Sequence, residues 1–248
     1  LLDKGADGIA LLTLNRPQAM NAIDRTMTGE MRSAIADIEA DAGIRVLVVT
    51  GAGEKAFCVG IDLKERQAMS DAEADDFRQG ELFPMYRELD AMETPAIAVV
   101  NGHALGGGFE IALACDLILA TGNACFGLPE VKWGLIPAAG GCTKLPKLIG
   151  AARAKEIILT ARTVLADEAE RLGIINRVVD TDTRLDAARE LASQIAAHGE
   201  FAVRAAKRCI DHALDAPAAN AYDVEASNLC YGDAGRKDGI ATFGTRKA

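Results

Sequence analysis

The 248-residue sequence predicts an α/β fold whose last part is mainly helical. In the first 140 residues, short apolar runs alternate with glycine-led or amphipathic segments, a pattern typical of strands joined by helices. The last hundred residues show apolar positions at helical spacing almost throughout. Half of the residues are hydrophobic and a quarter are charged, which is typical of soluble globular proteins, and the length allows a large core.

Six apolar runs, several of them rich in β-branched residues, are the predicted strands. They cover residues 8–14, 45–50, 96–100, 117–120, 124–126 and 174–179. The turn after the first strand contains Pro17, which fixes φ, and Asn15 and Asn21, which tolerate irregular backbone. A long loop rich in glycine and proline is expected over 127–141, and loops of this length inside compact domains are usually functional.

The predicted helices follow from apolar residues at helical spacing. The first begins at Asp24, a favoured N-cap residue, and runs to about residue 40. It places Met27, Met31, Ile35 and Ile38 on one face. Residues 63–90 are polar and irregular in pattern, although a helix is expected from residue 71 onward. Further helices are predicted over about 71–90, 109–115, 140–148, 151–159, 167–171, 181–197, 200–214, 217–230 and 235–243.

Composition argues against several functional classes. The formal net charge is −9 and no basic block occurs, so nucleic acid is not an expected partner. The six cysteines lack C-x-x-C spacing and the three histidines lack partners at ligand spacing, so we expect buried free thiols and no metal. No run approaches the ~18 apolar residues of a membrane span, and no membrane association is expected. The first residues resemble neither a signal nor a transit peptide, so we expect a cytoplasmic protein, or a mitochondrial-matrix protein if a leader was removed.

A glycine triplet lies at the centre of this organisation. Gly106, Gly107 and Gly108 follow the predicted strand 96–100, and the N–H groups at the helix start lack intrahelical partners, so they could bind a negative oxygen. A tight turn would also explain the glycines. Glu110, however, enters an otherwise apolar helix, and burial raises the pKa of a carboxyl group toward the range useful for acid–base catalysis.

Two other segments could complete a site around Glu110. Glu130 follows Pro129; its local sequence favours a solvated loop residue, but the chain could return it to the same end of the sheet. A pair of carboxylates then suits general acid–base chemistry, and the scarcity of aromatic residues argues against glycoside hydrolysis. Gly60 and Ile61 lie in a second loop, which is either an ordinary connection or the source of a second oxyanion-hole N–H.

Four motifs, in their joint order and spacing, resemble the crotonase (enoyl-CoA hydratase/isomerase) family from about residue 8 to 247. They are Asn15-Arg16-Pro17 with Asn21-Ala22; Ala56-Phe57-Cys58-Val59-Gly60-Ile61-Asp62-Leu63; Asn101-Gly102-His103-Ala104-Leu105-Gly106-Gly107-Gly108-Phe109-Glu110 with Ala114-Cys115-Asp116; and Phe126-Gly127-Leu128-Pro129-Glu130 with residues 134–141. The resemblance implies a crotonase-like spiral of ββα units over 1–190 and a C-terminal helical trimerisation region over 191–248. The expected assembly is a homotrimer or a dimer of trimers.

The resemblance also implies roles for individual residues. The N–H groups of Ile61 and Gly107 match the oxyanion hole for the thioester carbonyl. Glu110 and Glu130 match two catalytic glutamates that hold the water, of which Glu110 activates it for attack at C3 and Glu130 exchanges the proton at C2. CoA is part of the substrate, and no separate cofactor is implied. The residues matched to substrate or CoA contacts are Ile61, Asp62, Leu63, Lys64, Gly107, Ala138, Phe243 and Arg246.

Two positions depart from the family pattern. The C-terminal segment reads Phe243-Gly244-Thr245-Arg246-Lys247, without the glutamate usual between the Phe and the basic pair. Ala138 replaces a glycine and would be strained if that position required positive φ. The leading expectation is reversible hydration of a trans-2-enoyl-CoA. The alternatives are a specialised hydratase of methylglutaconyl-CoA or carnitinyl-CoA type, an enoyl-CoA isomerase, and an RNA-binding or assembly protein on the same scaffold.

Overall fold

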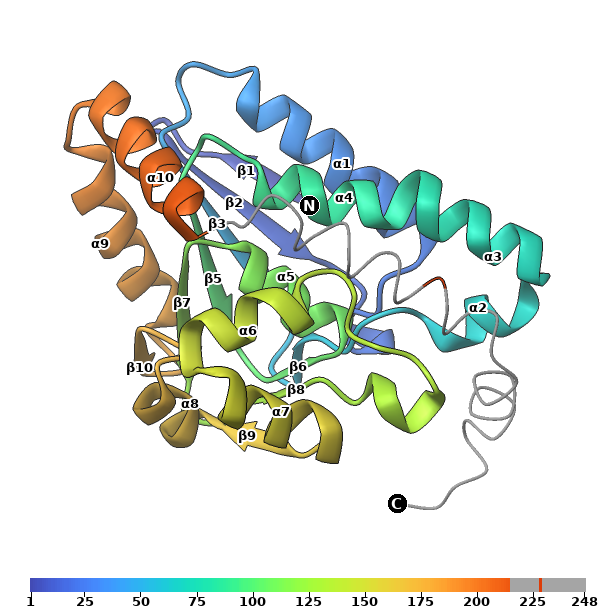
Figure 1. The fold of residues 1–248 in the computed structure, drawn as a ribbon. Coiled ribbons are helices and arrows are strands. Elements are labelled where there is room, and N and C mark those ends of the chain that lie inside the picture. The colour runs from blue at the N-terminus through green and yellow to red at the C-terminus, as the bar shows by residue number, and fades with distance from the viewer. Residues whose placement is uncertain (215–227, 229–248) are drawn as a thin grey trace.

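The computed structural model of the protein describes residues 1–214 and residue 228 (Figure 1). Six strands form a large sheet in the order β1-β2-β3-β5-β7-β10. They are β1 (Leu2–Lys4), β2 (Ile9–Leu14), β3 (Val46–Gly51), β5 (Ala96–Val100), β7 (Leu117–Thr121) and β10 (Arg177–Val179). All neighbours are parallel except β1, which runs antiparallel to β2. Strands β3 and β5 are buried along their whole length, which explains their continuous apolar sequences.

Four shorter strands form a small sheet in the order β4-β6-β8-β9. They are β4 (Ala56–Cys58), β6 (His103–Leu105), β8 (Cys125–Gly127) and β9 (Thr163–Leu165). The pairs β3/β4, β5/β6 and β7/β8 each place one strand in the large sheet and the next in the small one. Because both sheets keep these strands in chain order, the chain advances as a spiral of repeated two-strand units. The α/β fold and the spiral expected from the sequence are confirmed.

Helices cover both faces of the large sheet (Figure 1). On one face, a large core joins the sheet to α1, α4 and α5, while α9 packs on the opposite face over a second, smaller core. The helices are α1 (Arg25–Glu39), α2 (Leu63–Ala68), α3 (Asp71–Phe77), α4 (Phe83–Asp90), α5 (Gly107–Ala114), α6 (Gly141–Ile149), α7 (Ala151–Thr160), α8 (Ala166–Leu172), α9 (Arg184–Ala196) and α10 (Glu200–Leu214), with short turns η1 (Pro17–Ala19), η2 (Arg78–Leu82) and η3 (Glu130–Trp133). The expected division after residue 190 stays a prediction.

The start of α1 is as predicted. The Asp24 carboxylate accepts a hydrogen bond from the Met27 N–H at 2.7 Å, and the predicted apolar face is buried. The predicted helix over 71–90 forms as α3, η2 and α4, with the five-residue π-helix η2 in the middle. Helices predicted over 217–230 and 235–243 fall outside the described residues, apart from residue 228.

Several elements differ from the prediction. The strands β1, β4, β6 and β9 were not expected, because three residues are too few to show a period of two. The strand expected over 174–179 spans only Arg177–Val179. The segment expected to be irregular contains α2, whose N-cap is the Asp62 carboxylate; side-chain capping stabilises a helix that lacks an apolar stripe.

The cysteines largely match the expectation. Cys58, Cys115 and Cys125 are buried and Cys142 is half-buried, but Cys209 is exposed, so burial is wrong for that residue. All five carry thiols rather than disulfides, and Cys230 lies outside the described residues. In the part of the chain that the structure describes, no helix has both the length and the apolar character needed to cross a membrane. Over the same residues, no group of three or more His, Cys, Asp or Glu side chains is arranged to hold a metal ion.

Candidate active site

The glycine triplet forms the N-terminus of α5 and closes around the site. Gly106 has φ 52° and ψ −129°, a conformation that glycine adopts far more readily than other residues. A Cβ on Gly106 would lie 2.9 Å from Oε1 of Glu130, so the glycine also lets that carboxyl group approach the loop. A tight turn alone does not account for this stretch, because its backbone contacts a carboxyl group from a distant segment.

The two expected oxyanion donors lie on adjacent loops. A Cβ on Gly60 would lie 3.0 Å from the Gly107 nitrogen, which places the residue before Ile61 directly against Gly107. The Gly60 carbonyl accepts the Ile23 N–H and the Asp62 N–H donates to the Ile23 carbonyl, each at 2.8 Å. The Ile61 N–H between them therefore faces away from Ile23. Within residues 1–214, neither the Ile61 N–H nor the Gly107 N–H has a hydrogen-bond acceptor.

Tyr86 of α4 supports the Gly107 side of this arrangement. Its buried hydroxyl donates to the Gly107 carbonyl oxygen at 3.0 Å. Burial raises the pKa of Tyr86 well above its usual value, and the charges of Glu110 and Glu130 raise it further, so the hydroxyl remains a donor. Tyr86 is not among the residues that the sequence pattern predicts for the site. Its signal was weak: a polar tip on a helix face whose other buried residues are Phe83, Met85 and Leu89.

Glu110 is buried and held by backbone donors. Its Oε1 accepts the N–H of Ala139, in the loop before α6, at 2.7 Å and the N–H of Gly141, the first residue of α6, at 3.0 Å. Such N–H donors stabilise a carboxylate. Ala138 in the same loop has no positive φ, and the positive φ occurs at Gly140 instead. The strain considered for Ala138 is therefore absent.

Glu130 lies in a different environment. Its Oε2 is buried and lacks a hydrogen-bond partner in the described part of the chain, so its expected position as a solvated loop residue is wrong. Burial raises the pKa of Glu130 well above the usual range, and the negative charge of Glu110 raises it further. The residue is the first of η3, after Pro129. Two carboxyl groups twenty residues apart in the chain thus lie close enough to influence each other's ionisation.

Known proteins resemble this chain in both sequence and fold. The profile of the enoyl-CoA hydratase/isomerase family matches residues 4–247. The chain belongs to that family. It is 40% identical over 238 residues to the short-chain-enoyl-CoA hydratase of Clostridium acetobutylicum, covering 95% of this chain and 90% of that protein. It is 38% identical to the crotonyl-CoA hydratase of Syntrophomonas wolfei, covering 95% and 91%. A crystal structure of the Bacillus anthracis enoyl-CoA hydratase superposes with a TM-score of 0.84 at 34% identity, covering 98% of this chain and 95% of that one.

Similarity of this extent to several hydratases of the family indicates an enzyme of the enoyl-CoA hydratase type.

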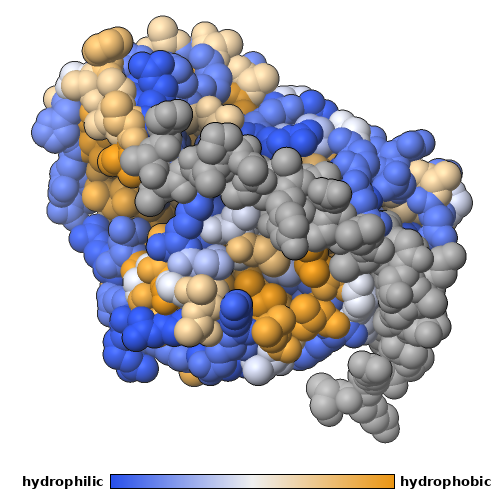
Figure 2. All heavy atoms as spheres, viewed as in Figure 1, coloured by the Kyte–Doolittle hydropathy of each residue, from blue (hydrophilic) through white to orange (hydrophobic). Residues whose placement is uncertain are grey.

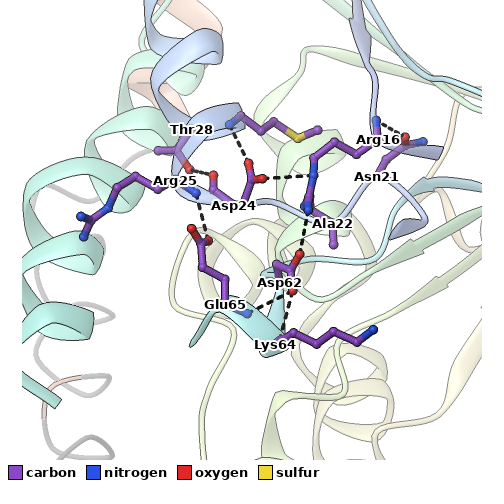
Figure 3. Close-up of polar contacts among 10 residues, drawn as sticks. Arg16, Asn21, Ala22, Asp24, Arg25, Thr28, Asp62, Lys64 and Glu65 are labelled. Carbon is purple, nitrogen blue, oxygen red and sulfur yellow. Dashed lines mark hydrogen bonds and ion pairs between the residues drawn. The ribbon is translucent and has the colours of Figure 1, made fainter. Parts of the chain in front are cut away.

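The other residues matched to CoA contacts differ in their exposure to solvent. Asp62 and Leu63 are half-buried and Lys64 is exposed. The Asp62 carboxylate is already engaged, because it caps α2 and pairs with Arg16 at 3.0 Å (Figure 3). Phe243 and Arg246 lie outside the described residues.

Proposed function

We propose that this enzyme adds water reversibly to a trans-2-enoyl-CoA to give a 3-hydroxyacyl-CoA, with Glu110 and Glu130 as its acid–base pair. The observation that carries the proposal is the contrast between the two carboxyl groups. Glu110 accepts two backbone N–H bonds. The neighbouring Glu130 instead has a raised pKa and a buried Oε2 without a hydrogen-bond partner among the described residues. N–H donors that stabilise the carboxylate of one group, beside burial that resists ionisation of the other, suit the first to act as base and the second as acid.

In this scheme the water lies between the two carboxyl groups. Glu110, as the carboxylate, accepts a proton from the water while the oxygen bonds to C3. The electron pair of the C2–C3 double bond moves toward the thioester carbonyl, whose oxygen becomes an enolate held by the N–H groups of Ile61 and Gly107. Glu130, as the acid, then gives its proton to C2. The thioester carbonyl reforms, and one water has been added; the proton on Glu110 returns to Glu130 to complete the cycle. Both carboxyl groups would act from one face of the double bond, giving syn addition.

The substrate would enter along the loop that carries Ile61. The chemistry needs no cofactor, because the thioester itself supplies the electron sink. Leu63, Lys64 and Ala138 remain proposed contacts for the acyl-CoA. For Asp62 we propose contact only through its backbone, since Arg16 and α2 engage its carboxylate. Phe243 and Arg246 stay predicted contacts for the nucleotide end of CoA.

We also propose that the chain assembles as a homotrimer or a dimer of trimers. Support comes from large apolar side chains that a monomer leaves exposed, including Leu148, Leu159 and Ile210. Figure 2 shows apolar surface beneath α10 and near α6. A groove of about 590 Å³ lies between these elements, with Leu113 and Val203 on its walls. Light scattering at micromolar concentration should give a trimer or hexamer, and a stable monomer would contradict this assembly.

A panel of acyl-CoA thioesters tests the reaction. Crotonyl-CoA should lose the absorbance of its conjugated enoyl thioester in the presence of enzyme, and comparison of kcat/KM with longer, branched and functionalised enoyl-CoAs should identify the preferred acyl group. Movement of a double bond from C3 to C2 without hydration would identify an isomerase instead. An absence of any turnover, with an RNA gel shift at physiological salt, would support the non-enzymatic alternative.

A further inference from the structure

We propose that Arg16 is a positioning residue that holds the loop presenting the Ile61 N–H and so controls how strongly the thioester carbonyl is polarised. The inference rests on the proposed function, in which Ile61 supplies one of two oxyanion donors. Arg16 is distant in the sequence from Ile61 and from both glutamates. Its effect would be exerted through Asp62 and the backbone before Ile23.

The guanidinium group of Arg16 bonds to three separate partners (Figure 3). Its Nε lies 3.1 Å from the Asp24 carboxylate, its Nη1 donates to the Ala22 carbonyl at 2.6 Å, and its Nη2 donates to the Asp62 carboxylate at 3.0 Å. Only 25% of the Arg16 side chain is exposed, so these bonds are largely shielded from water. The ammonium group of a lysine cannot reproduce this fork, because its three donors diverge from a single atom.

These partners hold the Ile61 loop from both sides. Asp62 is the residue after Ile61, and its backbone N–H also donates to Ile23. Ile23 follows Ala22, whose carbonyl Arg16 holds, and its N–H donates to Gly60, the residue before Ile61. Both peptide groups that bracket Ile61 are thus tied to Ile23, next to the carbonyl that Arg16 holds.

The turn that carries Arg16 is itself fixed. Asn21 is fully buried with φ 56°, and its Oδ1 accepts the Arg16 backbone N–H at 2.9 Å. Its Nδ2 donates to the carbonyls of Ala52 at 3.0 Å and Ala56 at 2.8 Å. Burial tends to raise the pKa of Asp62, but the hydrogen bonds from Arg16 and from the N–H groups of α2 outweigh it and lower the pKa. The Arg16–Asp62 ion pair therefore persists at neutral pH.

The size of the expected effect follows from the oxyanion hole. Removing one donor typically costs about 10²–10³ in kcat, and a misplaced donor retains part of its contribution. Arg16→Lys keeps the charge but removes the fork, and we expect kcat to fall about 10- to 100-fold while KM changes less than about threefold. Asp62→Asn should act in the same direction. The two losses should be strongly non-additive in the double mutant, because both substitutions break one linkage.

The decisive readout is spectroscopic and requires no turnover. Butyryl-CoA labelled with ¹³C at the thioester carbonyl is saturated and cannot be hydrated, and donors at its oxygen lower the carbonyl stretching frequency. We expect isotope-edited infrared spectra to show a clear downshift in the wild-type complex and a smaller one with Arg16→Lys and Asp62→Asn. The control is Arg162→Lys. Arg162 also joins two acidic side chains, Glu156 and Glu168, and its side chain donates to Glu156, Glu168 and Thr163, none of which belongs to the Ile61 loop.

The proposal predicts that Arg162→Lys preserves the full downshift, and that all three variants retain the wild-type circular dichroism spectrum. A full downshift in both Arg16→Lys and Asp62→Asn would overturn it, whatever their kcat. An equally reduced downshift in Arg162→Lys would also overturn it, because the reduction would then not be specific to the contacts of the Ile61 loop. A wild-type downshift without hydration of any enoyl-CoA would refute the proposed function yet leave this inference supported by the variants. No downshift in the wild type would refute both.

Discussion

Glu110 and Glu130 are the same residue type in two differently built environments. Glu110 lies on a regular helix, α5, and its Oε1 accepts two N–H bonds from the segment where α6 begins. Glu130 begins a single turn, η3, and its Oε2 is buried without a partner among the described residues. The first environment stabilises negative charge, and the second resists it. The difference teaches that backbone arrangement, rather than residue type, sets how readily each carboxyl group ionises.

Replacing either carboxyl group should have the largest effect. Glu110→Gln and Glu130→Gln should each reduce hydration about 10²–10⁴-fold, the range typical of a positioned acid or base. The double mutant should lose little more than the single mutants, because both groups act on the same water. The losses in the two single mutants and the double mutant are measured as steady-state kcat/KM for crotonyl-CoA. Full hydratase activity in Glu130→Gln would contradict the two-glutamate mechanism and leave Glu110 as the one glutamate that hydration needs.

The backbone donors beside the two glutamates should be nearly as sensitive. Gly107→Pro removes an N–H donor and restricts φ, and turnover should fall by about two orders of magnitude or more. Ile61→Ala keeps its N–H and should be mild. Equal losses in the two variants, measured by kcat, would mean that side-chain packing and not hydrogen bonding governs this region.

The influence of one carboxyl group on the other gives a smaller, directly measurable effect. The charge of Glu110 helps to raise the pKa of Glu130, so Glu110→Gln should lower it. Infrared titration of the protonated carboxyl band, with Glu130→Gln to assign it, follows that pKa. In the wild type, the acid must be protonated for hydration, so kcat/KM should fall as pH rises through this pKa. An unchanged band in Glu110→Gln would show that the two groups do not interact.

The smallest expected effect is on stability. A carboxyl group whose pKa is raised by folding favours the folded state fully at pH below its unfolded value of ~4.3, and this contribution is lost as pH rises toward the raised pKa. A tenfold difference in proton affinity between the folded and unfolded states corresponds to about 1.4 kcal/mol. Because Gln stays neutral, Glu130→Gln should gain stability relative to wild type as pH rises from ~5 to ~8. Urea unfolding at several pH values tests this, and a constant difference would contradict a raised pKa.

The sequence predicts the features that depend on neighbouring residues. Long apolar runs such as β3 and β5, and the Asp24 cap of α1, follow from local pattern alone. The resemblance to a known family supplied the spiral and brought Glu110 and Glu130 into one site. Local reasoning about Glu130 failed because its carboxyl group packs against Gly106, which is distant in the chain.

Other parts of the site depend on contacts that no local pattern encodes. Tyr86 contacts Gly107 from α4, twenty-one residues away, and Arg16 reaches Asp62 across forty-six. The unexpected strands β4, β6 and β9 form because they pair with other strands in the small sheet. Ladder pairing, not sequence periodicity, stabilises them.

The most direct test of the assigned roles is proton exchange at C2 of a saturated acyl-CoA in deuterium oxide. Exchange needs the oxyanion hole and one group that removes the C2 proton, but it needs no attacking water. We assign this step to the ionised form of Glu130, the group that gives a proton to C2 in the direction of hydration. We expect Glu110→Gln to retain measurable deuterium incorporation into butyryl-CoA while losing hydration, and Glu130→Gln to lose both. Exchange that survives in Glu130→Gln and disappears in Glu110→Gln would contradict this division of labour between the two glutamates.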